Sequence, residues 1–173
     1  METQEEPFIR RLMPDDAAAL GGFYDGLSDR SKRLFRPLGI KSTPEQCRHV
    51  AEGNLPAADT HFDLLALLGD RLVGWAFLWN QADKPGEAAL GIAVADDVQG
   101  RGLGRRLMAA LMAAARARRL RRINLTVVQD NLAAQRLYEE CGFIRTGSLT
   151  GSDGLDYFSM TQEVSPQPPP LSP

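Results

Sequence analysis

The chain has 173 residues, of which 24% are charged and 43% hydrophobic, and a formal net charge of −2; this composition is typical of one globular domain. The near-neutral charge gives no reason to expect nucleic acid or a membrane surface as partner. No apolar run approaches the roughly 20 residues of a membrane span, and the acidic start differs from a secretory signal. Cys47 and Cys141 form neither a metal-binding pattern nor a disulfide framework. We therefore expect a single cytoplasmic domain over residues 1–164, without a metal, and a Pro-rich disordered tail over residues 165–173.

Hydrophobic periodicity and turn residues predict the elements of the first half. Residues 28–38 are rich in Arg and Lys, and we assign no element to them. In chain order, the pattern predicts a strand over 8–12, a helix over 14–27, a helix beginning near 42–45, and a β-hairpin of 63–68 and 71–79 around the turn Gly69-Asp70.

The second half alternates strands and helices before it ends in a predicted pair of strands. Antiparallel strands come first and a strand–helix–strand–helix unit follows. The sequence therefore predicts an α/β fold whose sheet is mixed, with the antiparallel part typical of α+β proteins. The predicted elements are a strand over 87–94, a helix over 102–118, a strand over 123–128, a helix over 131–141 that ends before Gly142, and two strands around the turn 152–154.

Three glycines at alternate positions, Gly100, Gly102 and Gly104, follow a predicted strand and extend into the start of a predicted helix. Such a turn lets main-chain N–H groups converge at the positive end of the helix, where a phosphate group binds well. The spacing lacks the third glycine of a dinucleotide fingerprint and the Gly-Lys-Ser/Thr of a P-loop. The pattern thus predicts a phosphate site of another class.

Residues 99–104, Gln-Gly-Arg-Gly-Leu-Gly, resemble the acyl-CoA loop Gln/Arg-x-x-Gly-x-Gly/Ala of the GNAT family of N-acetyltransferases. The resemblance continues in residues 131–143, which match that family's Asn…Leu-Tyr…Gly-Phe segment. It covers residues 87–143, about a third of the chain. The fold implied is a central twisted, mostly antiparallel sheet of six to seven strands with a splayed parallel pair, flanked by helices.

The resemblance also implies an activity: transfer of an acetyl group from acetyl-CoA, as co-substrate, to a primary amine by direct attack in a ternary complex. The acceptor is a small-molecule amine or a peptide or protein amine, and the chain is a monomer or a homodimer. A non-catalytic acyl-CoA-binding or sensing domain is the alternative. The residues expected to bind acetyl-CoA are Ile92, Ala93, Val94, Gln99, Gly100, Arg101, Gly102, Leu103, Gly104, Arg105, Asn131, Ala134 and Tyr138.

For catalysis, the resemblance assigns Tyr138 as the acid that meets the leaving thiolate. Because its reference pKa of about 10 exceeds the thiol's of about 8.5, hydrogen-bond donation is its expected role. Glu87 resembles a carboxylate that some members use as a base, often through water. The sequence leaves three alternatives to Glu87 open: His61, Asp63 and Asp156. Gly91 is compatible with a bulge in the strand that flanks the co-substrate.

Several further residues have a structural and a functional interpretation. Arg105 and Arg106 lie in the first turn of a helix, where a cation is disfavoured unless an anion binds there. Asn131 is a preferred N-cap as well as a candidate ligand. The arginines between 116 and 122 are expected to be solvated, and Trp75 and Trp79 to pack in the core. Acidic candidates for holding a cationic acceptor are Asp25, Asp29, Asp153 and Asp156.

Overall fold

The computed structural model describes residues 6–164, so the predicted tail over 165–173 lies outside the described residues. Along the chain the elements are β1 (Phe8–Arg11), η1 (Pro14–Asp16), α1 (Ala17–Gly26), α2 (Asp29–Leu34), α3 (Pro44–Gly53), β2 (His61–Leu68), β3 (Arg71–Asn80), β4 (Glu87–Val94), η2 (Asp96–Val98), α4 (Leu103–Ala117), β5 (Arg122–Val128), α5 (Leu132–Glu140), β6 (Ile144–Thr150) and β7 (Asp156–Glu163).

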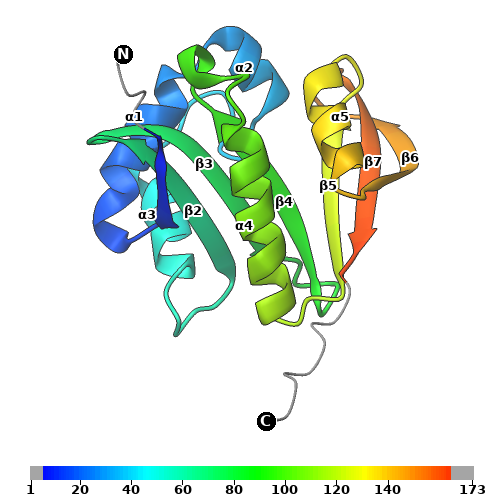
Figure 1. Cartoon of the computed structure of the whole chain (residues 1–173), viewed down its shortest axis with the longest axis horizontal. Helices are drawn as coiled ribbons and strands as arrows, with labels where there is room; N and C mark the ends of the chain where they lie inside the picture. The colour runs from blue at the N-terminus through cyan, green and yellow to red at the C-terminus, as the bar shows by residue number, and fades with distance from the viewer. Residues whose placement is uncertain (1–5, 165–173) are drawn as a thin grey trace.

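The strands form one seven-stranded sheet in the order β1-β2-β3-β4-β5-β7-β6. Every neighbouring pair is antiparallel except β4 and β5, which run parallel. That pair is short, since only residues 87–89 of β4 are in register with residues 122–124 of β5. Beyond them the two strands diverge, and Figure 1 shows the opening widening toward the end where α2 lies. The predicted fold, including the splayed parallel pair, is confirmed.

Helices cover both faces of the sheet (Figure 1). A Cβ atom at Gly74 of β3 would lie 3.2 Å from Leu107 Cδ1, which places α4 on that face. The next residue, Trp75, points to the other face, where its ring meets Phe35 at 5.5 Å and Tyr24 at 6.3 Å between centroids. The sheet therefore has one face covered by α4, called the α4 face, and one covered by α1 and α2, called the α1–α2 face.

Most of the predicted elements are present, and two differences bear on the site. The Arg- and Lys-rich segment contains the helix α2, whose first turn is capped by Ser28 accepting from the Ser31 amide. The suggestion of a bulge at Gly91 is wrong, because the β3–β4 register is continuous there; the register shift lies in β2, between Ala66 and Leu67. Packing of Trp75 in the core is confirmed, since its side chain is completely buried.

Within residues 6–164, none of the helices has the length and apolar character that crossing a bilayer requires. Cytoplasmic location stays a prediction.

Candidate active site

A cavity of about 560 Å³ occupies the opening between β4 and β5. Its wall comes mainly from α2 and the residues after it, β4, the loop before α4 with the first turn of that helix, β5 and α5, and β3 and β7 add Phe77 and Tyr157. Of the residues expected to bind acetyl-CoA, ten line it: Ile92, Ala93, Val94, Gln99, Gly100, Leu103, Gly104, Asn131, Ala134 and Tyr138.

The edge of β4 that faces the cavity is unpaired beyond Ala89, because the register with β5 ends there. The N–H and C=O groups of alternate residues in a strand point to opposite sides. The amide after the strand, at Ala95, donates to Val73 of β3, so the main-chain groups of Ala93 also point toward β3. Those of Ile92 and Val94 consequently point into the opening. The Val94 carbonyl there accepts from Gln99, whereas the two amides and the Ile92 carbonyl can pair with an extended ligand.

The loop before α4 presents free main-chain donors. Gly100 and Gly102 have φ angles of +76° and +83°, a region that side chains disfavour. Gly102 is the N-cap of α4 and supplies no side-chain cap. Within the described residues, the amides of positions 102–105 donate no hydrogen bond, and the first amide used is that of Arg106. Four such donors at the positive end of a 15-residue helix form a strong anion site.

Two side chains of this loop and one from the first turn of α4 bind other groups of the protein. The Gln99 amide donates to the Val94 carbonyl at 3.0 Å and to Ser31 Oγ at 3.3 Å. Arg101 donates to the Asp97 carbonyl. Arg105 forms an ion pair with Glu140 of α5, and its side chain, like that of Arg101, lies outside the cavity wall. Gln99 thus ties the loop to β4 and α2, whereas Arg101 and Arg105 brace its outer side.

Asn131 is the N-cap of α5 and also lines the cavity. Its Oδ1 accepts a hydrogen bond from the Ala134 amide at 3.3 Å and so caps α5. The Nδ2 group of the same side chain donates no hydrogen bond within the described residues, and Asn131 lines the cavity. The cap therefore orients the side chain and leaves a donor for a ligand.

Tyr138 of α5 lines the cavity with 7% of its surface exposed. Its ring packs against Phe143, with 5.9 Å between centroids. Burial raises the pKa of Tyr138 to about 12, and its hydroxyl therefore stays protonated at neutral pH. Such a hydroxyl is a hydrogen-bond donor to an anion that forms nearby.

Glu87 does not line the cavity. Its carboxylate accepts from Asn124 Nδ2 at 2.7 Å and lies 3.4 Å from Arg122. Side chains at alternate strand positions share a face, so Glu87 lies on the α1–α2 face together with Gly91, about 13 Å away along β4. Any contact between Glu87 and a ligand at Gly91 requires intervening groups such as water.

The alternatives to Glu87 also lie outside the wall. Asp63 is fully buried and accepts hydrogen bonds from the indoles of Trp75 at 2.7 Å and Trp79 at 3.3 Å. His61 packs on Trp79, and burial lowers its pKa. Asp156 accepts from Thr150 Oγ1 on the neighbouring strand.

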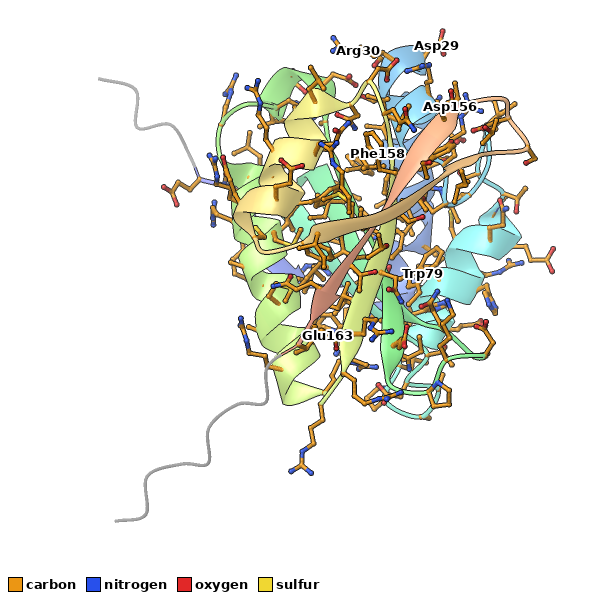
Figure 2. All side chains as sticks on the ribbon, turned by 90° about the vertical axis from the view of Figure 1, so that its right-hand side faces the viewer. Asp29, Arg30, Trp79, Asp156, Phe158 and Glu163 are labelled. Carbon is orange, nitrogen blue, oxygen red and sulfur yellow. The ribbon has the colours of Figure 1, made fainter. Side chains whose placement is uncertain are left out.

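None of the four acidic candidates for holding a cationic acceptor lines the cavity either. Asp25 accepts from the Ser42 amide, and Asp153 accepts from Tyr157 Oη at 2.6 Å. Figure 2 shows Asp29 on α2 and Asp156 on β7 at the same end of the molecule, with Trp79 and Glu163 farther toward the other end.

Sequence reasoning missed the wall contributed by α2. The unassigned basic segment supplies three arginines to the cavity, and β5 and β7 supply Thr126 and Tyr157. The density of Arg and Lys in the sequence was a weak signal, because it is equally typical of a solvated surface. The residues from this segment that line the cavity are Arg30, Ser31, Arg33, Leu34, Phe35, Arg36 and Pro37.

The model of the Acetyltransferase (GNAT) family matches residues 29–143. The chain therefore belongs to the GNAT family of acetyltransferases. Mycothiol acetyltransferase of Geodermatophilus obscurus is 34% identical over 147 residues, which cover 78% of this chain and 47% of that protein. The enzyme of the same name from Actinosynnema mirum is 36% identical over 136 residues, 75% of this chain and 46% of that protein. The chain spans about half the length of these curated relatives.

Solved structures agree on the fold. An acetyltransferase of the GNAT family from Streptococcus pneumoniae superposes with a TM-score of 0.79 at 27% identity, covering 92% of this chain and all of that one. The Salmonella typhimurium protein yncA, solved with acetyl-CoA, superposes with a TM-score of 0.77 at 19% identity, covering 96% of this chain and 99% of that one. At that identity the second comparison concerns the fold alone.

Proposed function

We propose that this chain transfers an acetyl group from acetyl-CoA to a primary amine, in the cytoplasm. The observation that carries the proposal is the set of unpartnered amides at positions 102–105, which fits the diphosphate of coenzyme A. The pantetheine arm is then placed along the free edge of β4, at Ile92 and Val94. Bound acetyl-CoA supplies the thioester carbonyl that the acceptor amine attacks.

Direct attack in a ternary complex is favoured by the thiols of the chain. Cys47 is buried, Cys141 lies outside the cavity wall, and burial raises the pKa of both. A protonated thiol away from the cavity is a poor acyl acceptor. In the proposed reaction the nitrogen–carbon bond therefore forms as the carbon–sulfur bond breaks, the amine loses one proton, and the coenzyme leaves as a thiol.

Tyr138 is the residue proposed to donate a hydrogen bond to the departing sulfur. A β4 amide, of Ile92 or Val94, is proposed to donate to the thioester oxygen as charge builds on it. Glu87 is the proposed base, acting through water, because it lies on the α1–α2 face of β4 and the described cavity wall contains no carboxylate.

The test is an assay of the full chain with acetyl-CoA against a panel of amines, amino acids and peptides. Thiol release is followed together with the mass of the product. We expect acetylated amine, intersecting initial-rate lines and no acetylated protein intermediate. Parallel lines with an acetylated cysteine would contradict direct attack. Tight binding of acetyl-CoA with no turnover on any acceptor would favour the non-catalytic sensing domain.

A further inference from the structure

The part of the cavity formed by α2 is positively charged. Arg30, Arg33 and Arg36 line it, and the wall includes no Asp or Glu from the described residues. A protonated amine entering such a site is repelled, whereas a ligand with its own negative group is attracted. The charge of the wall therefore favours an acceptor that is not simply a cation.

Arg33 and Arg36 differ in what they already bind. Arg33 forms two hydrogen bonds with Asp130, at 2.8 and 3.0 Å, across the end of the opening. Arg36 uses its Nε for the Lys32 carbonyl at 3.0 Å. Its nearest carboxylate, on Asp153, is 3.9 Å from Nη1, which is too long for a hydrogen bond. Within the described residues, both Nη groups of Arg36 thus remain available.

Asp153 is also occupied by other donors. Its oxygens accept from Tyr157 Oη at 2.6 Å and from the Leu155 amide at 3.1 Å. It therefore stabilises the orientation of Arg36 by charge without saturating it. A planar guanidinium with two free donor groups matches a carboxylate, which accepts two parallel hydrogen bonds.

Arg36 lies away from the loop that is proposed to hold the coenzyme diphosphate. That loop contacts α2 through Ser31, whereas Arg36 lies beyond the other end of the same helix. A helix of six residues is about 9 Å long. The same cavity wall has an apolar part, formed by Phe35 and Phe77 with 6.0 Å between ring centroids.

We propose that the acceptor is an amine that also carries a carboxylate and an apolar body, of the kind found in an apolar amino acid. Its carboxylate binds the free Nη edge of Arg36, and its apolar body packs on Phe35 and Phe77. The inference rests on the proposed function, which it deepens by naming the substrate class.

The experiment separates recognition from turnover. The full chain, saturated with coenzyme A, is titrated calorimetrically with N-acetyl-phenylalanine, N-acetyl-leucine and their uncharged amides. We expect each acid to bind at least about tenfold more tightly than its amide. Arg36→Gln reduces this ratio to about twofold or less. Arg36→Lys keeps the positive charge but lacks the two parallel donors of the guanidinium, and it gives an intermediate ratio. Arg48→Gln, an exposed arginine outside the cavity wall, is the control and leaves the ratio unchanged.

The same acid and amide pairs, without their acetyl groups, are then offered as acceptors. We expect kcat/KM to favour the acid, mainly through KM, even though the amide's less basic amine is the more reactive at neutral pH. Equal affinity for acid and amide, or no binding of either acid, overturns the proposal. Weaker coenzyme A binding by Arg36→Gln with the acid preference intact also overturns it. Acid preference in binding without acetyl transfer supports this site and contradicts the proposed function.

Discussion

Gly91 of β4 and Phe77 of β3 face each other across the antiparallel pair, and the Phe77 ring fills the space that a side chain at position 91 would occupy. A Cβ atom at Gly91 would lie 2.4 Å from Phe77 Cζ and 3.0 Å from Phe35 Cε2. Both rings line the cavity. The absence of a side chain at position 91 thus shapes the wall on the α1–α2 face.

Gly91→Ala should therefore displace Phe77 and lower the free energy of unfolding by about 1–3 kcal/mol. Because the displaced ring lines the cavity, KM for the acceptor should rise more than KM for acetyl-CoA. Thermal unfolding and steady-state kinetics measure the two effects. Gly22→Ala, at a helical glycine with open space around it, provides the control. Equal stability and equal acceptor KM in the wild type and Gly91→Ala would refute this account of the wall.

Tyr138→Phe should lower kcat roughly ten- to 100-fold, because it removes the donor proposed for the leaving sulfur. Affinity for acetyl-CoA should change little, since the ring and its contact with Phe143 remain. As the pKa of Tyr138 is about 12, the wild type should show no loss of rate from its ionisation up to pH 10. Rate measurements between pH 6 and 10 and calorimetry test both statements. Undiminished kcat in the variant would remove Tyr138 from the mechanism.

Glu87→Gln should lower kcat, because Glu87 is proposed to accept the amine proton through water. Glu163→Gln is a matched control, because Arg122 binds both carboxylates, and Glu163 is exposed at the end of β7. Steady-state kinetics at saturating substrates measure the effect, and an equal kcat in the wild type and both variants would exclude Glu87 as the base.

Asp63 makes a prediction about stability that is independent of the active site. Burial raises its pKa to about 7, against the opposing effect of the hydrogen bonds from Trp75 and Trp79 and the charge of Arg11. In the unfolded chain an aspartate has a pKa of about 3.9. Between these two values the folded protein holds a proton that the unfolded chain has lost. The contribution of Asp63 to stability is therefore present below about pH 4 and decreases as the pH rises to 7.

Asp63→Asn should remove this dependence. As the pH is lowered from 7.5 to 5, the free energy of unfolding of the wild type should rise relative to that of the variant by up to about 1.4 kcal/mol per pH unit. The Tm of the wild type should rise relative to that of the variant over the same range. The other titrating groups are common to both proteins and cancel in the difference. Thermal melts at half-unit intervals measure it. Parallel Tm curves for the two proteins would show that Asp63 is ionised throughout.

The loop before α4 could be predicted from the sequence because its geometry is local. The positive φ angles at Gly100 and Gly102 and the free first turn of α4 follow from residue types and their spacing. The cap at Asn131 is local in the same way. For these features, neighbours in the chain determine the backbone.

The acceptor side of the cavity could not be predicted because tertiary contacts determine it. Asp25 and Asp153 looked available in the sequence, yet a main-chain amide and a tyrosine hydroxyl occupy their carboxylates in the fold. Arg36 belongs to a segment for which the sequence predicted no element, yet the divergence of β4 and β5 leaves it in a cavity wall. Single residue types do not reveal which charges the fold will leave unpaired.

The most direct test of the central claim is an NMR titration of glycine-¹⁵N-labelled protein with coenzyme A. The account predicts large changes in the amide signals of Gly102 and Gly104, where free N–H groups meet the diphosphate, and little change at Gly21 and Gly22 of α1. Saturation with coenzyme A that leaves the Gly102 and Gly104 signals unmoved would contradict it.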